Sequence, residues 1–270
     1  PVVRALPAGI ILHHFTMAHY HICALDGSGA AWCMGLGDDY RLGTGDATSS
    51  STFREVVMPQ GVSFAQMDCG YNGCCAVDTL GDGWCWGKNL FGESGTGDET
   101  TVTATPVRVL MPPGSHFKSI KRYNHVCGLD VTGVGFCWGS NLYGRIGIGD
   151  MAVAYSATPL QVLTPVGISF TFMELSLNAS CALSTTGEVY CWGSGSSWEQ
   201  GDGSSETDAA PTPVTMPAGT SFIAVSGGTT HFCALDQYGY PWCWGSGSQG
   251  EMGDGETSEN SVPSQIARAE

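Results

Sequence analysis

The cysteines are the residues of this sequence whose number and spacing suggest chemistry most directly. Twelve occur in 270 residues, and ten of them form five pairs whose members are ten positions apart. The pairs are Cys23 and Cys33, Cys75 and Cys85, Cys127 and Cys137, Cys181 and Cys191, and Cys233 and Cys243. Their first members follow one another at steps of 52, 52, 54 and 52 residues. Such a period indicates one recurring covalent feature of a repeat architecture.

Each cysteine pair encloses a short apolar run, a glycine-containing turn and a second apolar run, which is typical of a β-hairpin. Antiparallel pairing about Ser28 places Cys23 directly opposite Cys33, and the same centre fits the other four units. Opposed residues at a non-hydrogen-bonded position lie close enough for a disulfide. We therefore predict five hairpin disulfides, each adding about 2–3 kcal/mol of stability.

Cys69 and Cys74 occur only in the second unit and are five positions apart, so they are expected to close a local loop. Cys75 beside Cys74 leaves the pairing partner open. Buried free thiols are the alternative for all these residues, but core packing would not require cysteine at both places in every unit. Zinc sites favour C-x2-4-C clusters, which a ten-residue spacing does not provide. We expect disulfides, with no metal and no cofactor.

Histidines near the hairpins are the next candidates for ligand chemistry. Three of them stand two residues before the first cysteine of a unit: His21, His125 and His231. A structural role that bridges strands is the favoured interpretation of these three. His19 and His21 are expected on one strand face, with His13 and His14 upstream, and two imidazoles on one face are able to hold a metal ion. The lack of a nearby acidic partner disfavours that site.

A recurring loop after each hairpin ends in Gly-Asp or carries an aspartate close to that place. These aspartates are Asp46, Asp98, Asp150, Asp202 and Asp254. Calcium loops need several oxygen ligands at close spacing, a pattern the sequence lacks, so each aspartate is expected to cap its own turn. A glycosidase needs two carboxylates at a set separation, but no acid stands in a distinctive context and no nucleophile motif occurs. We predict no catalytic site and no enzymatic activity.

Asn178-Ala179-Ser180 is an N-glycosylation sequon, the only one in the sequence. It lies directly before Cys181, so occupancy depends on its exposure. Serine- and threonine-rich stretches at 47–52 and 99–105 are candidates for O-glycans or are simply polar loops.

The elements that position these residues are short strands arranged in repeats. After each hairpin the chain runs through a glycine-rich loop and a polar connection into a segment that is predicted to start a further strand. These segments begin at Pro1, Phe53, Pro106, Pro159, Pro211 and Pro263. They predict repeats at about 1–52, 53–105, 106–158, 159–210 and 211–262 within one domain of residues 1–270, with 263–270 beginning a sixth repeat.

The combination H-x-C-A-L, G-x-x-x-C-W-G, N-L-x-G-x-x-G-x-G-D and P-x-x-V resembles the RCC1 repeat family, in a cysteine-bearing, secreted form. The likeness recurs five times over essentially the whole chain, with Met34 replacing the tryptophan of the first unit. It implies an all-β fold, a β-propeller of four-stranded blades, either as a closed ring or as an open arc completed by a neighbouring chain. Nothing in the sequence matches the nucleotide-exchange activity of the nuclear family member.

Composition restricts the class of partner. Thirty-nine glycines and only 13% charged residues suit many tight turns between short strands. The formal net charge of −15 disfavours nucleic acid, and no apolar run approaches the length that crosses a bilayer. The disulfides favour an extracellular or cell-surface location.

Six strand-starting segments against five hairpins leave one surplus strand. Three outcomes follow: the last segment, Pro263 to Glu270, is donated to a neighbouring subunit, or the five units form an open arc that another chain completes, or the sequence is a segment of a longer array. The first two give head-to-tail assembly with itself or with another repeat chain, which is the outcome we favour. The resulting hypothesis is a non-enzymatic, extracellular scaffold subunit of a fibre or surface appendage.

An extracellular binding module, such as a lectin, adhesin or protein inhibitor, is the alternative function. It is based on aromatic residues that follow the hairpins at similar places: Tyr40, Phe91, Tyr143 and Trp198. Exposed aromatics of this kind often anchor partners, among them glycans, although packing between blades is the favoured interpretation of these four.

Overall fold

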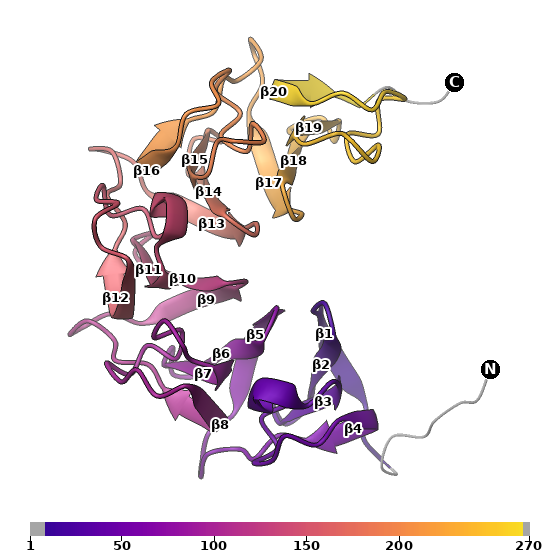
Figure 1. Ribbon diagram of the computed structural model, residues 1–270, viewed down its shortest axis with the longest axis vertical. Helices are drawn as coiled ribbons and strands as arrows, with labels where there is room; N and C mark the ends of the chain where they lie inside the picture. The colour runs from indigo at the N-terminus through magenta and orange to yellow at the C-terminus, as the bar shows by residue number, and fades with distance from the viewer. Residues whose placement is uncertain (1–8, 267–270) are drawn as a thin grey trace. The chain divides into compact units, whose positions relative to one another are not determined.

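The computed structural model describes residues 9–266, which form twenty strands in five four-stranded antiparallel sheets (Figure 1). The all-β prediction is therefore confirmed. In each sheet, called a blade below, the strands pair in chain order.

The bounds of the strands repeat closely from blade to blade. Blade 1 contains β1 (Leu12–Met17), β2 (His21–Asp26), β3 (Ala31–Gly35) and β4 (Ser50–Glu55). Blade 2 contains β5 (Phe64–Gly70), β6 (Gly73–Asp78), β7 (Gly83–Lys88) and β8 (Val102–Arg108). Blade 3 contains β9 (Phe117–Arg122), β10 (His125–Asp130), β11 (Gly135–Ser140) and β12 (Tyr155–Gln161). Blade 4 contains β13 (Phe170–Leu175), β14 (Ala179–Ser184), β15 (Val189–Gly193) and β16 (Asp208–Pro213). Blade 5 contains β17 (Phe222–Gly227), β18 (His231–Asp236), β19 (Pro241–Gly245) and β20 (Asn260–Gln265). Two short 3-10 helices, η1 (Asp38–Tyr40) and η2 (Leu142–Gly144), lie in the loops after β3 and β11.

The proline-led segments close a blade, where the sequence pattern suggested that they open one. Pro106 lies inside β8 and Pro263 inside β20, and both strands are the outermost of their sheets. Proline lacks a backbone N–H, so an outer strand accommodates it without losing a ladder hydrogen bond. These strands therefore begin earlier than expected, at Val102 before Pro106 and at Asn260 before Pro263.

The C-terminal strand is not surplus. β20 pairs with β19 of its own blade, with Trp242 opposite Gln265 and Cys243 opposite Ser264. The described part of this segment is thus paired within its own blade through one edge of β20, and donation of residues 263–270 to a neighbouring subunit stays a prediction. Residues 267–270, and most of the copy that begins at Pro1, lie outside the described residues.

The first strand of each later blade begins with a phenylalanine, a strand that the sequence pattern did not reveal. In blades 2 to 5 this ring stacks on the tryptophan of the third strand of the same blade. The pairs are Phe64 with Trp86, Phe117 with Trp138, Phe170 with Trp192 and Phe222 with Trp244, at centroid distances of 6.0, 5.7, 6.4 and 6.3 Å. Each tryptophan is fully buried. Stacked aromatic pairs thus form the centre of blades 2 to 5.

The cysteines face each other across the second and third strands. Cys23 lies opposite Cys33 and Cys233 opposite Cys243, and both pairs form disulfides. Bonds of the same spacing join Cys75 to Cys85 and Cys181 to Cys191. Cys127 and Cys137 are also disulfide-bonded. Cys69 pairs with Cys74, and no described cysteine is free.

The glycine of each C-W-G or C-M-G motif is required by its backbone. Gly87 has a φ of 99°, and a Cβ there would meet the carbonyl oxygen of Asn72 in the turn between the first and second strands. The pairing register shifts at the same point, between Cys85 and Gly87. Only glycine adopts such a conformation without strain, so the motif marks the bulge that ends each hairpin.

The described residues divide into two compact units. One holds the residues up to Val131 together with Trp138–Ser140 and Tyr155–Pro159, and the other holds the remaining residues from Thr132 onward. Neither 3-10 helix, nor any other helix in residues 9–266, has the length and apolar character needed to cross a membrane.

Candidate binding surface

Aromatic side chains gather on the turns that join the first and second strands of blades 1, 2 and 3. The His19 ring stacks on Tyr71 with centroids 4.6 Å apart, and Tyr20 meets Tyr71 edge-on at 5.7 Å. Tyr123 of the next turn lies 6.4 Å from Tyr71. His19, Tyr20, Tyr71 and Tyr123 are together called the aromatic surface below. Tyr20 is 49% exposed and His19 is exposed as well, whereas Tyr71 and Tyr123 are half-buried beside them.

Buried polar contacts hold the aromatic surface in place. Arg41, which is 4% exposed, donates to the Tyr71 carbonyl at 3.3 Å, and its guanidinium lies 5.7 Å from the centre of the Tyr20 ring. A Cβ at Gly70 would clash with the backbone of Tyr123, so glycine lets the turns of blades 2 and 3 approach each other. A hydrogen bond with Tyr20 raises the pKa of the Tyr71 hydroxyl. The three turns are therefore positioned by the blades below them.

A cavity of about 350 Å³ opens beside the aromatic surface. His19, Tyr20 and His21 line one part of it, and Met34, Ser50 and Ser51 line the rest. The lining combines aromatic rings, one thioether and hydroxyl groups, which suits a ligand that has both an apolar face and hydrogen-bonding groups.

His19 and His21 do not share a strand face, which corrects the expectation for a two-histidine metal site. His19 lies in the turn before β2 and faces outward, whereas His21 begins β2, is 2% exposed and places its Nε2 3.2 Å from the Sγ of Cys74. His14 contacts the Met67 carbonyl from β1 at 2.8 Å. Burial lowers the pKa of His21 to about 3, and the positive charges of Arg41 and Arg122 act in the same direction. His21 is therefore neutral and bridges two blades, the structural role that the sequence favoured.

The loop aspartates cap their own turns, as predicted. Each carboxylate accepts a hydrogen bond from the backbone N–H two residues later. The donors are Thr48, Thr100, Ala152, Ser204 and Glu256, at 2.8, 3.0, 2.8, 2.8 and 3.0 Å from Asp46, Asp98, Asp150, Asp202 and Asp254. Asp46 also accepts two hydrogen bonds from Arg54, and these bonds hold the pKa of its carboxyl far below the usual range. These contacts give each aspartate a structural use.

The four loop aromatics singled out from the sequence are partly exposed. Phe91 is 40% and Tyr143 45% exposed, whereas Tyr40 and Trp198 are half-buried. Tyr40, Tyr143 and Trp198 have positive φ angles. Phe91 lies 6.3 Å from the Tyr155 ring, and Trp198 donates to a Glu259 carboxylate oxygen at 2.7 Å. They are spread over separate loops, so none joins the aromatic surface.

Asn178 lies in the turn between β13 and β14 and is half-buried. Its side-chain oxygen accepts a hydrogen bond from Arg145 at 3.1 Å, while the hydroxyl of Ser180 is buried and donates to the Arg145 carbonyl. Glycosylation at Asn178 stays a prediction.

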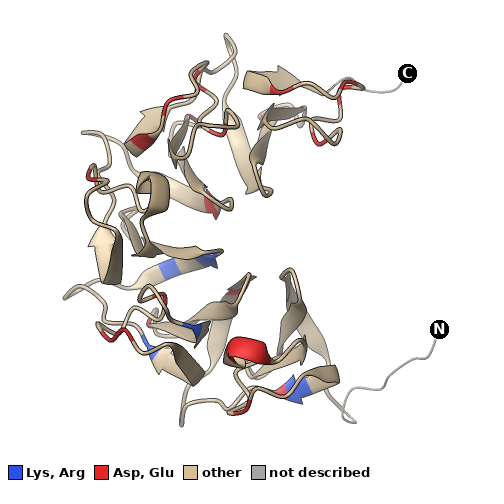
Figure 2. Cartoon of the chain, viewed as in Figure 1, with Lys and Arg blue, Asp and Glu red and all other residues tan. Residues whose placement is uncertain are grey.

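Charge is distributed unequally between the two units (Figure 2). Among the described residues, seven basic side chains belong to the unit that contains the aromatic surface, and Arg145 alone belongs to the other. The described acidic residues number twelve in each unit. The second unit is therefore the more strongly acidic and repels anionic ligands, whereas the unit with the aromatic surface does so less.

Blades 1 and 5 each leave part of a sheet face uncovered. In blades 2, 3 and 4 the first strand exposes at most one residue, and every residue of the second strand is buried. In blade 1, by contrast, Phe15 and Met17 on β1 are 56% and 79% exposed. In blade 5, Ile223 on β17 and Leu235 on β18 are 61% and 42% exposed. Apolar exposure at these places marks surfaces that are suited to contact with another sheet.

A cluster that the sequence did not reveal lies between blades 1 and 2. The Nε2 or Nδ1 of His21 and the sulfur atoms of Cys23, Cys69 and Cys74 all lie within 4.8 Å of one another, and all four residues are buried. The ten-residue spacing of the cysteines within one repeat does not predict metal ligands, but this cluster combines cysteines of two repeats. The sulfurs of Cys23 and Cys74 come from different blades and meet only through blade packing.

Comparisons with known proteins agree with the repeat assignment. The family described as the Regulator of chromosome condensation (RCC1) repeat matches residues 28–77 and 186–235. The Ultraviolet-B receptor UVR8 of Arabidopsis thaliana is 26% identical over 94% of this chain, and the human E3 ubiquitin-protein ligase HERC2 is 27% identical over 92%. The chain spans 58% of the length of UVR8 and 5% of the length of HERC2.

Solved structures show the same fold. Human WBSCR16 superimposes with a TM-score of 0.85 at 18% identity, over 98% of this chain and 70% of that one. Yeast RCC1 (Prp20), from a complex with Kap60, gives a TM-score of 0.60 at 20% identity, over 95% of this chain and 75% of that one. Together with the five four-stranded blades, these matches show a fold like that of the RCC1-type β-propellers, and two segments of the chain match the RCC1 repeat itself.

Proposed function

We propose that this chain is an extracellular, non-enzymatic binding module that holds a glycan on the aromatic surface and in the cavity beside it. The observation that carries the proposal is the juxtaposition of solvent-exposed Tyr20 and His19 with a cavity of about 350 Å³. A sugar ring has apolar faces that pack on aromatic rings and hydroxyl groups that suit a polar wall, and Ser50 and Ser51 line the cavity. The disulfides support an oxidising location outside the cell.

The rigidity of the aromatic surface also favours binding. Aromatic side chains supply large contact area and lose little conformational freedom, especially when their turns are already fixed. Arg41 and Gly70 hold the turns of adjacent blades together, so a ligand would not have to order them. The lower negative charge of this unit fits a neutral or weakly anionic glycan.

A glycan array followed by calorimetric titration of the best ligand tests this function. Tyr20→Ala and Tyr71→Ala are each expected to weaken binding by roughly tenfold or more, because each removes a central aromatic contact. Tyr143→Ala is the matched control, since Tyr143 is 45% exposed but lies on another loop. Absence of glycan binding, or binding that ignores Tyr20→Ala and Tyr71→Ala, would overturn the proposal. Capture of a protein that depends on the same two residues would replace the glycan by a protein partner.

Assembly with another repeat chain is a second candidate, favoured by the uncovered faces of blades 1 and 5. Each of the five described blades already has its own fourth strand, β4, β8, β12, β16 or β20, and four of these strands contain proline. A further RCC1-like blade from a neighbouring chain would cover Phe15 and Met17 in the way that blades pack elsewhere. Such head-to-tail contacts would make the protein a scaffold subunit of a fibre or surface appendage.

Light scattering coupled to size exclusion tests the assembly. The oxidised protein is expected to form oligomers whose mass rises with concentration, and Phe15→Glu should shift them to monomer. Leu163→Glu is the control, because Leu163 is 59% exposed but lies beyond the fourth strand of blade 3. A monomer at all concentrations, or equal effects of the two substitutions, would argue against assembly through blade 1.

A further inference from the structure

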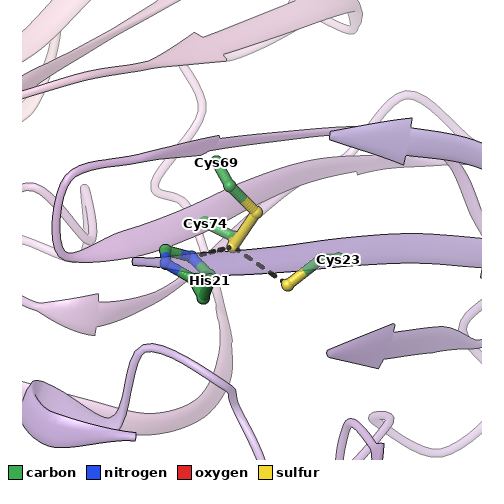
Figure 3. Close-up of side chains that lie close together, drawn as sticks. All are labelled: His21, Cys23, Cys69 and Cys74. Carbon is green, nitrogen blue, oxygen red and sulfur yellow. Dashed lines mark hydrogen bonds between the residues drawn. A yellow bond between two sulfur atoms is a disulfide. The ribbon is translucent and has the colours of Figure 1, made fainter. Parts of the chain in front are cut away.

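His21 and the sulfur atoms of Cys23, Cys69 and Cys74 cluster between blades 1 and 2, where the disulfide of Cys69 and Cys74 meets the sulfur of Cys23 (Figure 3). The Sγ atoms of Cys23 and Cys74 lie 3.6 Å apart although their residues are 51 positions apart in the chain. Cys23 is bonded to Cys33, and Cys74 to Cys69. The Sγ of Cys74 also has a second neighbour, the Nε2 of His21, at 3.2 Å.

We propose that reduction of these two disulfides creates a metal site in which Cys23, Cys69, Cys74 and His21 bind one zinc or another thiophilic ion. Three thiolates and one imidazole are a common ligand set for tetrahedral zinc, with zinc–sulfur distances of about 2.3 Å. Such distances place neighbouring ligand atoms about 3.5–3.8 Å apart, close to the separations of Cys74 from Cys23 and from His21. Cys69 and Cys74 need only a side-chain rotation once their bond is open.

The reaction balances with a dithiol as reductant. Two dithiol molecules become cyclic disulfides and deliver four electrons and four protons, which open both protein disulfides to four thiols. Metal binding then releases three protons, one each from Cys23, Cys69 and Cys74, and His21 supplies a nitrogen lone pair. The thiol of Cys33 keeps its proton. The occupied site carries a net charge of −1, because three thiolates exceed the charge of the ion by one.

The surroundings suit that charge and that ion. Arg41 and Arg122, which are 4% and 3% exposed, are the cations nearest enough to act on His21, so buried positive charge offsets the negative cluster. The four ligands are buried, which excludes competing water. The cavity that His21 lines gives the ion a route from solvent.

The site is specific to one blade junction. Cys69 and Cys74 correspond to Leu175 and Ser180 in blade 4 and to Gly227 and Phe232 in blade 5. The junction of blades 4 and 5 therefore contains the corresponding hairpin disulfide, Cys181–Cys191, without the additional ligands. A chain kept oxidised holds two disulfides at the first junction, and a chain exposed to thiols exchanges them for a metal centre. The inference is independent of glycan binding.

Cobalt titration of the intact chain, reduced anaerobically with a phosphine, tests the site. Tetrahedral Co²⁺ with thiolate ligands has intense visible absorption, which Zn²⁺ then abolishes by displacement. We expect one Co²⁺ per reduced chain and none per oxidised chain. His21→Asn and Cys69→Ala should each weaken binding by roughly tenfold or more, as loss of a ligand does. The double variant Cys233→Ala/Cys243→Ala is the control and should bind as the original chain does.

The same variants also test the site if the reduced chain unfolds before it binds metal. If metal merely binds an unfolded chain, the cluster variants and the control lose affinity equally, which overturns the proposal. If metal also restores folding, the aromatic circular dichroism returns with one equivalent in the original chain and in the control only. Absence of stoichiometric binding would likewise contradict the site.

The variant Cys33→Ser tests the contact without any reductant. Its free Cys23 thiolate should attack the Sγ of Cys74, so that a Cys23–Cys74 bond forms, the Cys69–Cys74 bond breaks and Cys69 leaves as a thiolate that takes up a proton. A peptide map under non-reducing conditions should then show the Cys23–Cys74 bond and a free Cys69. Retention of the Cys69–Cys74 bond would show that the sulfurs do not meet and would overturn the proposal.

Discussion

The junction between blades 1 and 2 and the junction between blades 4 and 5 share one frame but differ in chemistry. In both, a buried tryptophan of the later blade donates to a loop carbonyl of the earlier one: Trp86 to Arg41 at 3.1 Å and Trp244 to Glu199 at 3.0 Å. At the first junction His21 and Cys74 meet beside this bond, whereas Ala179 and Phe232 belong to one apolar cluster at the other. The repeated tryptophan therefore holds each blade against the one before it, and the residues next to it differ between the two junctions.

The largest expected effect should be shared by both junctions. Trp86→Ala and Trp244→Ala are each expected to lower the free energy of unfolding by about 4–5 kcal/mol, through the lost aromatic burial and the unpaired loop carbonyl. Chemical denaturation measures the loss. Trp198→Ala, at a half-buried loop position, should have a much smaller effect. A large difference between Trp86→Ala and Trp244→Ala would show that the frame is not equivalent at the two junctions.

Acid should weaken the first junction specifically. His21 has a pKa of about 3 in the folded chain against 6.5 when unfolded, so between these pH values the unfolded chain binds a proton that the folded chain does not. Stability should therefore fall as pH drops from 6.5 towards 3, by about 4 kcal/mol for this group. Denaturation at a series of pH values should show a shallower slope for His21→Gln. An unchanged slope would contradict the buried neutral imidazole.

The contribution of a disulfide to stability should depend on the length of the loop that it closes. The double variant Cys233→Ala/Cys243→Ala opens a separation of ten residues and is expected to lose about 3 kcal/mol. Cys69→Ala/Cys74→Ala opens a separation of five and should lose about 2 kcal/mol, because a shorter loop restricts the unfolded chain less. Thermal unfolding of the two variants tests the order, and the reverse order would contradict the loop-entropy explanation.

The smallest expected effect on stability concerns Arg41 and Glu199, whose backbone carbonyls accept the tryptophan hydrogen bonds. Arg41→Met should cost about 1–3 kcal/mol, because it leaves the carbonyls of Asp38 and Tyr71 without their side-chain donor. At the matching position, burial raises the pKa of Glu199, and its carboxylate accepts from the backbone N–H groups of Ser197 and of Glu199 itself. Glu199→Gln should therefore change stability by less than about 1 kcal/mol at neutral pH. Equal losses of unfolding free energy for Arg41→Met and Glu199→Gln would contradict the different roles of these two side chains.

The sequence alone determined the covalent and local features of the blades. The ten-residue spacing about a turn such as Ser28 placed Cys23 opposite Cys33, since register in a hairpin follows from the turn. The aspartate after each glycine-rich loop was correctly expected to cap its turn, because that hydrogen bond joins residues two positions apart. The all-β class followed from the same short-range patterns and from the family resemblance.

Only the tertiary structure decided which repeat a segment joins and what its neighbours are. A repeating sequence is compatible with a strand at Pro263 that begins a blade and with one that ends it. The pairing of β20 with β19 shows that it ends blade 5. His21 and Cys74 are 53 residues apart, and Tyr20, Tyr71 and Tyr123 belong to three different turns. Contacts of this kind arise from the packing of one blade against the next, which a pattern within a single repeat does not encode.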